Sequence, residues 1–329
     1  MFMIKVSVIV PIYNVQQFIK HCAQSLLQQS LKEVEFIFVN DASPDNSVEI
    51  LKSVVKDYPE RMGNVKILTH GVNRGLPAAR NTGLSVATGE YIFHCDGDDF
   101  VEPDMLEILY KEAKELELDI VWCDWFLSFE HNERYMRQPD YYTAHEALVG
   151  MLAGAMKFNV WNKLVKRSLY NDNGIKFPEG YSMGEDMTMI MLFANAQRVK
   201  YVPRAFYHYV KFNMGAFSQT FSEQHKIALK YNVQRVSEYL LRKYGGDMEL
   251  YTSFLKLETK FPFLIIDGSR KMYDLWVEWF PEANNYILQN KNISLKNRYL
   301  QWVAWKGQYW LVWLHYQLII KVVYGIIYR

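Results

Sequence analysis

Residues 5–13, KVSVIVPIY, are almost wholly apolar and rich in β-branched side chains. Such a run is typical of a strand that is buried on both faces of a parallel sheet. Asn14 follows directly and can cap a helix, and the apolar residues after it recur at helical spacing. This stretch therefore predicts a buried strand followed by a helix.

The same alternation continues to about residue 130. Further strands are predicted at residues 34–41, 64–70, 90–96 and 119–129. Helical patterns lie between them, starting near Ser43 and Asp45 and then covering residues 76–87 and 102–116. Alternating strands and helices favour an α/β fold, with an open, mostly parallel sheet and helices on both faces.

Polar residues follow the predicted strands at the point where each strand ends. They are Asn14 after the first strand, Asp41 after the second, residues 70–74 after the third and residues 96–99 after the fourth. In sheets of this kind, ligands bind outside the carboxyl ends of the strands. The pattern therefore predicts a binding site at this edge of the sheet.

The composition narrows the class of protein. The chain has 329 residues, enough for two domains or for one domain with a long appendage. Half of the residues are hydrophobic, as in a globular protein with a large core. The 37 basic and 36 acidic residues give a net charge of +1, which offers no support for a nucleic-acid partner.

The cysteines and the N-terminal stretch bear on the compartment. The three cysteines form no CxxC pattern, which argues against a disulfide framework or a zinc site and favours a reducing compartment. Residues 1–14 lack an export signal, and no uncharged run has the length of a membrane-spanning helix. We therefore expect a cytoplasmic protein.

Residues 93–99, FHCDGDD, place three aspartates within four positions behind an apolar run. Their carboxylates repel one another, but carboxylate oxygens are the ligands that Mg²⁺ and Mn²⁺ prefer. Gly97 allows the backbone to pass close to a ligand. The alternative is an acidic turn that caps the next helix, a role that suits Asp99.

A second acidic pair, Glu185 and Asp186, lies in SMGEDMTM, residues 182–189. Repulsion between two carboxylates raises the pKa of one of them, which suits a general base. The alternative is a helix start with acidic residues, because the helix dipole favours negative charge there.

Four segments together resemble the family 2 glycosyltransferases, which are inverting enzymes with the GT-A fold. They are VSVIVPIYN (6–14), FVNDASPDNS (38–47), NRGLPAARNTGLSVATGEYIFHCDGDD (73–99) and GEDM (184–187). The resemblance covers roughly residues 4–215 and implies a Rossmann-like, mostly parallel sheet with a helical C-terminal extension. It implies a catalytic domain over residues 1–215, divided into a nucleotide-sugar half (1–125) and an acceptor half (126–215), and a helical, aromatic-rich region over residues 216–329.

By this resemblance, seven residues bind the nucleotide-sugar: Pro11, Tyr13, Asp41, Asn73, Arg74, Arg80 and Asp96. Tyr13 would stack on the base or ribose, Asp96 would bind the ribose, and Asp41 would accept the uracil N3–H. A carboxylate acceptor fits uridine or guanosine and not adenine, which makes a UDP-sugar the expected donor. The alternatives are a half-buried core role for Tyr13, a helix cap for Asp41 and a bracing of the acidic loops by Arg80.

The resemblance also implies a divalent cation, Mn²⁺ or Mg²⁺, and a catalytic base. Asp98 is the expected metal ligand, with Asp99 and His208 as further candidates. Asp186 is the expected base, supported by Glu185. Trp161 and Lys163 are expected near the acceptor. Trp161 is equally compatible with a core position, and a histidine between aromatic residues, such as His208, is often structural.

Residues 299–329 are dense in Trp and Tyr, with Lys306, Lys321 and Arg329 among them. Interfacial helices combine an apolar face, aromatic residues and basic residues. We therefore expect a peripheral contact with the inner face of the cell membrane, where lipid-linked acceptors reside. The alternatives are packing on the catalytic domain and an oligomer contact.

The sequence thus predicts a metal-dependent, inverting glycosyltransferase acting on a glycan or lipid-linked glycan in bacterial surface polysaccharide synthesis. One alternative is a nucleotidyltransferase, but residues 11–18, PIYNVQQF, lack the Gly-rich loop that is usual in that class after the first strand. A second alternative is a non-catalytic carbohydrate-binding relic, which the presence of Asp41, Asp96, Asp98 and Asp186 disfavours.

Overall fold

The computed structural model describes residues 3–211 and 222–324. The chain divides by its internal contacts into two units. The first comprises residues 1–146 and 158–234, and the second comprises residues 147–157 and 235–329. The functional boundaries expected at residues 125 and 215 stay predictions.

One sheet runs through the first unit, in the order β3-β2-β1-β4-β8-β6-β9-β5, and β7 pairs with β6 at its side. The strands are β1 (Val6–Ile12), β2 (Val34–Asn40), β3 (Val65–Thr69), β4 (Tyr91–His94), β5 (Phe100–Val101), β6 (Ile120–Ser128), β7 (Glu133–Met136), β8 (Lys163–Lys166) and β9 (Val199–Val210). Strands β3, β2, β1 and β4 are parallel, as are β6 and β9. Strand β8 is antiparallel to both of its neighbours, β4 and β6.

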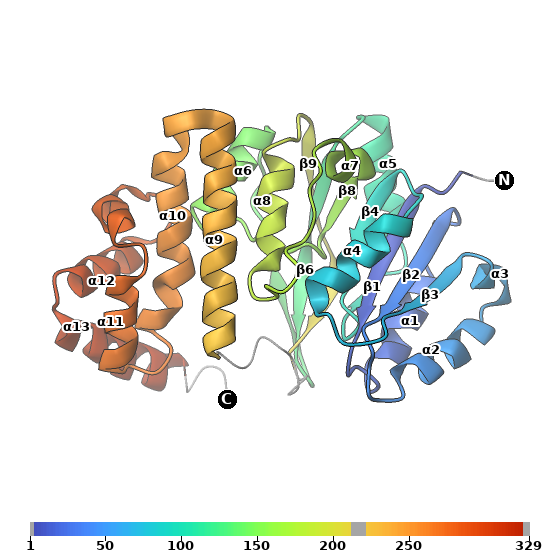
Figure 1. Cartoon of the computed structure of the whole chain (residues 1–329), viewed down its shortest axis with the longest axis horizontal. Helices are drawn as coiled ribbons and strands as arrows, with labels where there is room; N and C mark the ends of the chain where they lie inside the picture. Colours follow the sequence, from blue (N-terminus) through green and yellow to red (C-terminus); the bar gives the residue numbers. More distant parts are fainter. Residues whose placement is uncertain (1–2, 212–221, 325–329) are drawn as a thin grey trace. The chain divides into compact units, whose positions relative to one another are not determined.

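Helices flank this sheet (Figure 1). They are α1 (Ile19–Leu27), α2 (Ser47–Lys56), α3 (Pro59–Met62), α4 (Leu76–Val86), α5 (Met105–Glu115), α7 (Arg167–Asp172) and α8 (Thr188–Phe193). Two further helices, α6 (Ala144–Leu152) and α9 (Glu223–Tyr244), each contain residues of both units. The predicted α/β class is confirmed, with a mostly parallel sheet flanked by helices and a helical C-terminal region.

The central strands are buried because their side chains are apolar on both faces. Every residue of β2 is buried, and β1 is buried at all positions except Pro11. The register pairs Ile12 with Asn40, and Ile9 with His94, so the carboxyl ends of β1, β2 and β4 lie at the same edge. This is the edge at which the polar clusters were predicted.

Two predicted helix starts need correction. Helix α1 begins only at Ile19, with Phe18 at its N-cap, and Asn14 lies in a turn with a φ of 55°. Asn tolerates this left-handed conformation, which cannot begin a right-handed helix. Helix α2 begins at Ser47, and its backbone N–H and hydroxyl are both bound by Asp45 Oδ1, at 3.1 and 2.6 Å.

The second unit contains α10 (Glu249–Lys260), α11 (Arg270–Glu278), α12 (Leu295–Trp305) and α13 (Tyr309–His315). Short 3₁₀ segments precede or join these helices: η3 (Gly245–Met248), η4 (Phe261–Leu264) and η5 (Pro281–Gln289). The π-helical segment η6 (Tyr316–Tyr324) follows α13. A further 3₁₀ segment, η1 (Glu185–Met187), belongs to the first unit. In the core of the second unit, Lys260 Nζ donates to the carbonyl of Trp279 and to Asn284 Oδ1, at 2.6 and 2.7 Å. Within the described parts of the chain, no helix combines the length and apolarity needed to cross a bilayer.

Candidate active site

Arg80 is the centre of the site. Its side chain comes from α4, which packs on β1 and β2, and it is only 1 % exposed. Its Nη1 lies 3.0 Å from Glu185 Oε1 and 2.7 Å from Asp186 Oδ1, and its Nη2 lies 2.9 Å from Asp96 Oδ1. One guanidinium therefore joins a carboxylate of the acidic loop after β4 to both carboxylates of η1.

Gly184 sets the direction of the chain into η1. Its φ of 83° is left-handed, a conformation that favours glycine. A Cβ at this position would also lie 3.0 Å from Leu229 Cδ1. The turn delivers Glu185 and Asp186 in succession toward Arg80. The Asp186 side chain keeps 21 % of its surface exposed and that of Glu185 keeps 9 %, so Asp186 is the more accessible carboxylate.

The electrostatics reflect three carboxylates that share one cation. Burial alone would lower the pKa of Arg80, but the charges of Asp186, Asp96 and Glu185 raise it overall. Burial and the neighbouring Asp186 raise the pKa of Glu185 to about 8, although Arg80 opposes this. Burial also raises the pKa of Asp186, again against the effect of Arg80. A carboxyl group with a raised pKa is a better proton acceptor once it is ionised.

Lys163 lies close enough to interact with this cluster. The residue is fully buried in β8, and its Nζ donates to the carbonyl of Asn159 and to Asn162 Oδ1, at 2.7 and 2.8 Å. Burial lowers the pKa of Lys163 to about 7, although the charge of Asp186 opposes the shift. The structure thus brings Lys163 of β8 near the expected base.

The acidic loop passes directly against the end of β1. A Cβ on Gly97 would lie 2.9 Å from the carbonyl oxygen of Pro11, so only glycine allows this approach. Asp96 and Asp98 on either side are partly exposed, whereas Asp99 is buried. The loop therefore leaves the Asp96 and Asp98 side chains partly accessible beside the residues expected to contact the nucleotide, with one oxygen of Asp96 bound by Arg80.

Asp99 binds the neighbouring strand β9. Its Oδ2 accepts from the Tyr207 hydroxyl at 2.6 Å, and its Oδ1 accepts from the Val210 N–H at 2.8 Å. The Tyr207 oxygen also accepts from the Asp96 N–H at 3.1 Å. Burial, Asp98 and Asp96 raise the pKa of Asp99 well above its usual range. Both oxygens of Asp99 thus hold the acidic loop to β9, and we leave Asp99 out of the proposed ion site.

Tyr207→Phe is expected to lower the free energy of unfolding by about 1–3 kcal/mol, because buried Asp99 loses a donor and the Asp96 N–H loses its acceptor. Urea unfolding measures the change. Tyr142→Phe is the matched control, because Tyr142 is 88 % exposed. Equal stability of the Tyr207 variant and the control would show that this hydroxyl does not hold the loop.

His208 and Trp161 occupy structural surroundings. His208 Nδ1 lies 2.7 Å from Glu133 Oε1 and its Nε2 lies 2.9 Å from Glu102 Oε1, so both ring nitrogens are engaged. Trp161 is buried and stacks on Tyr207, with 4.4 Å between the ring centroids. The surroundings match the core alternative for Trp161 and the structural alternative for His208, and their roles with acceptor and metal stay predictions.

Asp41 anchors the loop that precedes α4. Its Oδ1 accepts from His70 Nδ1 at 2.6 Å and from the Arg74 N–H at 2.8 Å, and its Oδ2 accepts from the Gly75 N–H at 2.7 Å. The sequence placed His70 in the same polar cluster but gave it no role. These three hydrogen bonds hold buried Asp41, at the end of β2, against the loop between β3 and α4.

Three other residues that are expected to bind the sugar donor lie at the surface, at the carboxyl ends of the parallel strands. Tyr13 is 49 % exposed, and Asn73 and Arg74 are exposed as well. Arg74 Nη2 lies 3.0 Å from Glu179 Oε2, and Asn81 Nδ2 donates to the same carboxylate at 3.1 Å. Glu179 was missed in the sequence because a lone glutamate in a loop carries no distinguishing pattern.

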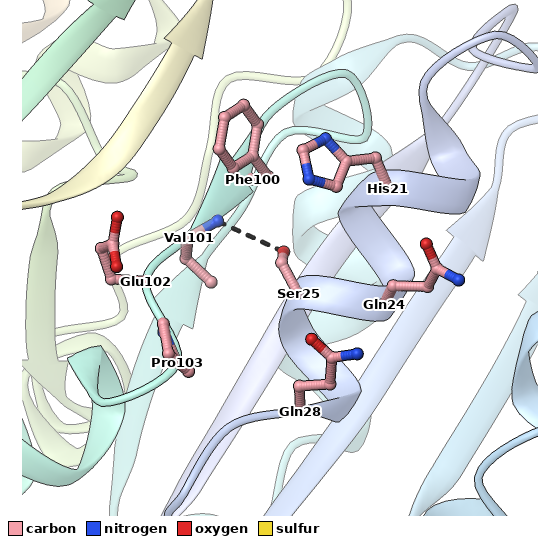
Figure 2. A pocket seen from close by; sticks show the side chains of 8 residues that line it. All are labelled: His21, Gln24, Ser25, Gln28, Phe100, Val101, Glu102 and Pro103. Atoms are coloured by element: carbon pink, nitrogen blue, oxygen red, sulfur yellow. Dashed lines mark hydrogen bonds between the residues drawn. The ribbon is translucent and has the colours of Figure 1, made fainter.

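A separate groove lies between α1 and β5, next to the acidic loop. Figure 2 shows its side chains: His21, Gln24, Ser25, Gln28, Phe100, Val101, Glu102 and Pro103. Its volume is about 430 Å³. None of the residues joined by Arg80 lines it, so the carboxylate cluster and this groove are distinct features of the first unit.

Comparison with known proteins places the chain in a family. The family model described as Glycosyl transferase family 2 matches residues 7–180. Glycosyltransferase YibD of Escherichia coli is 31 % identical over 82 % of this chain and 81 % of its own length. Glycosyltransferase EpsJ of Bacillus subtilis is 36 % identical over 62 % of this chain, and the match spans 60 % of EpsJ. The cholesterol galactosyltransferase of Borreliella burgdorferi is 33 % identical over 79 % of this chain and 74 % of its own length.

Solved structures support the fold. TarS residues 1–349 of S. aureus, in complex with UDP-GlcNAc, superpose with a TM-score of 0.70 over 95 % of this chain and 91 % of that one, at 20 % identity. Since the family model covers more than half of the chain and a relative above 30 % identity aligns over four fifths of it, the predicted family is confirmed: the chain belongs to glycosyl transferase family 2 and is a transferase.

Proposed function

We propose that the protein moves a sugar from a nucleotide-diphosphate donor, a UDP-sugar, to a glycan or lipid-linked glycan with inversion at the sugar carbon. The observation that carries the proposal is the Arg80 cluster, which joins Asp96 of the acidic loop to Asp186 of η1. In one step of displacement, the group that binds the donor and the group that activates the acceptor must be held in fixed register. Arg80 supplies this connection.

The donor base fits the residues at the ends of β1 and β2. Tyr13 is exposed and available for stacking, and Asp41 lies buried at the base of the same edge. Asp96, whose side chain is 24 % exposed, faces solvent enough to bind a ribose hydroxyl. The solved TarS structure with UDP-GlcNAc supports a uridine nucleotide, although the likeness to that chain extends to the fold alone.

The acidic loop fits a divalent cation, Mn²⁺ or Mg²⁺. Asp96 and Asp98 both raise the pKa of buried Asp99, which shows that negative charge accumulates here. Across residues 3–211 and 222–324, no three His, Cys, Asp or Glu side chains are grouped to hold an ion on their own. Mg²⁺ commonly takes one or two protein carboxylates and completes its shell with phosphate oxygens, so Asp98 and a donor diphosphate suffice. Bound there, the cation would offset the charge of the leaving diphosphate.

Asp186 would take the proton of the acceptor hydroxyl. It is the more exposed of the two η1 carboxylates, its pKa is raised, and Arg80 fixes one of its oxygens. Glu185 supports it through the shared guanidinium. Lys163 is placed to stabilise the ionised form of Asp186.

A donor panel tests the function. UDP-GlcNAc, UDP-glucose, UDP-galactose and GDP-mannose are each added with Mn²⁺ in a thermal-shift assay, and nucleotide release is then measured with the best donor. We expect one UDP-sugar to raise the melting temperature in the presence of Mn²⁺, because a ligand that binds only the folded state stabilises it. Release of UDP distinguishes a transferase from a carbohydrate-binding relic.

Asp98→Asn is expected to remove most of the shift caused by Mn²⁺, since an amide is a far weaker ligand for a hard cation than a carboxylate. Asp57→Asn is the matched control, because Asp57 is exposed at the end of α2. A full Mn²⁺ shift in the Asp98 variant would reject this ion site. Binding of a donor without any release of nucleotide would reject the proposed activity.

The acceptor and the membrane contact form a further part of the proposal. One relative is a cholesterol galactosyltransferase by name, so a lipid-borne acceptor is compatible with a chain of this kind. Three exposed aromatic residues lie within residues 299–313: Tyr299, Trp310 and Trp313. We therefore keep peripheral membrane contact through residues 299–329 as part of the proposed function.

A further inference from the structure

Helix α13 and the following η6 expose a continuous apolar stripe. The exposed residues are Trp310, Trp313, Leu314, Leu318 and Val322, with exposed fractions between 40 and 63 %. Their positions are i, i+3, i+4, i+8 and i+12, which is the spacing of one helix face. The residue that joins the two segments, Tyr316, has helical backbone angles, so the stripe runs without a break.

The opposite face of the same helix is already occupied. Val312 and Tyr316 are buried within the second unit. A helix with one apolar face would satisfy its packing by burying that face. This helix is apolar on two sides, and the outward side, with two tryptophans, consists of residues that are 40–63 % exposed. Contiguous exposed apolar surface of this kind marks an interaction site.

Along the sequence, the segment that carries the stripe has charge of a single sign, while Asp274 and Glu278 of α11 lie close to Tyr309 at its start. From Ala283 to Arg329 the sequence contains no Asp or Glu. It contains six basic residues: Lys291, Lys296, Arg298, Lys306, Lys321 and Arg329. Lys306 precedes the stripe, and Lys321 lies within it beside Val322. The remainder of the chain is correspondingly acidic overall, because the net charge of the whole sequence is only +1.

This chemistry selects the occupant. Two copies of this face would bring like charges together, which disfavours self-association. An anionic lipid surface offers the opposite charge, an apolar layer for Leu and Val, and an interfacial zone that tryptophan prefers. Lysine side chains can extend from such a stripe to the headgroups.

We propose that the Trp310–Val322 stripe docks the protein on anionic phospholipid, with the helix lying in the plane of the interface. This deepens the membrane contact of the proposed function, naming the face that enters the lipid and the charge of the lipid that it selects. The stripe would hold the second unit at the surface on which a lipid-linked acceptor is found.

Vesicle flotation of the full chain tests the proposal without donor or acceptor, so its result is independent of the proposed activity. We expect binding to phosphatidylcholine vesicles that contain about 30 % phosphatidylserine, and weak binding to phosphatidylcholine alone. About 0.5 M salt should reduce the binding, since the Debye length falls to a few ångströms. Equal binding to neutral and anionic vesicles would overturn the selection of anionic lipid.

The double variant Trp310→Ser with Trp313→Ser is expected to reduce partitioning at least about tenfold, because interfacial binding scales with buried apolar area. Tyr142→Ser is the control, since Tyr142 is an exposed aromatic residue of the first unit. The melting temperature and UDP release in solution should remain unchanged, which excludes misfolding. Unchanged vesicle binding overturns the proposal. A change in oligomeric state in the double variant, with unchanged vesicle binding, overturns it in favour of a contact between copies.

Discussion

Asp186→Asn is expected to lower kcat about 10²–10⁴-fold, the usual contribution of a positioned general base. Asparagine keeps the shape of the side chain and an oxygen that can accept from Arg80, but it cannot take a proton. Donor binding should change little, because most groups expected to contact the nucleotide lie in the loops after β1, β2, β3 and β4, and the variant keeps an acceptor for Arg80. The measurements are UDP release under saturating donor and acceptor, and donor affinity by calorimetry.

The pH dependence of this variant separates a base from a structural acid. The pKa of Asp186 is raised, so in the wild type the fraction of ionised base, and with it kcat, falls as the pH drops through that raised pKa. In the Asn variant this limb of the profile should be absent. Asp172→Asn, an exposed position in α7, should retain both the wild-type rate and profile. Near-normal turnover in Asp186→Asn would transfer the role of base to another group.

Arg80→Met is expected to lower the free energy of unfolding by about 3–5 kcal/mol, the usual cost of removing one partner of a buried charge cluster. Glu185 and Asp186 would remain buried without the cation that now offsets their charge. Arg80→Lys should recover only part of the loss, because an ammonium lacks the planar fork that reaches three carboxylates at once. Urea unfolding at several pH values measures both variants.

The loss in Arg80→Met should grow with pH. The Glu185 pKa is already raised in the folded protein, and removing Arg80 raises it further, since Arg80 now opposes the shift. A carboxyl group with a raised folded-state pKa favours folding below its unfolded value and loses that contribution as the pH rises through the folded value. The variant should therefore be nearest to wild type in acid. Arg74→Met, which removes an exposed pair with Glu179, should cost about 0–1 kcal/mol. A loss no larger than this control would show that the cluster does not stabilise the fold.

Much of the parallel part of the sheet was predictable because its signal is local. β1, β2 and β4 are short, continuous apolar runs that end in polar residues, and a parallel sheet buries such runs on both faces. The antiparallel insertion of β8 between β4 and β6 was not predictable in this way. Its register with both neighbours depends on pairing between residues far apart in the sequence, and residues 160–170, which mix apolar and basic side chains, do not indicate the direction of the strand.

The candidate site was predicted residue by residue but not in its connections. The bracing alternative for Arg80 agrees with its three carboxylate contacts. The acidic triplet, by contrast, gave no sign that Asp99 turns inward to Tyr207 while Asp98 stays at the surface. That distinction depends on a hydroxyl from β9, more than a hundred residues along the chain, and on the burial that it brings.

The shared guanidinium also limits how this protein can be divided. Asp96 is the only partner of Arg80 among the three that the first 125 residues supply, and the other two arrive with η1. The first 125 residues alone would hold a buried cation with one counter-charge, and the later segment alone would hold Glu185 and Asp186 without the guanidinium that binds both. Neither segment alone therefore balances the charge of this cluster. The two segments cannot be exchanged between relatives as independent modules unless residue 80 and residues 185–186 are exchanged together.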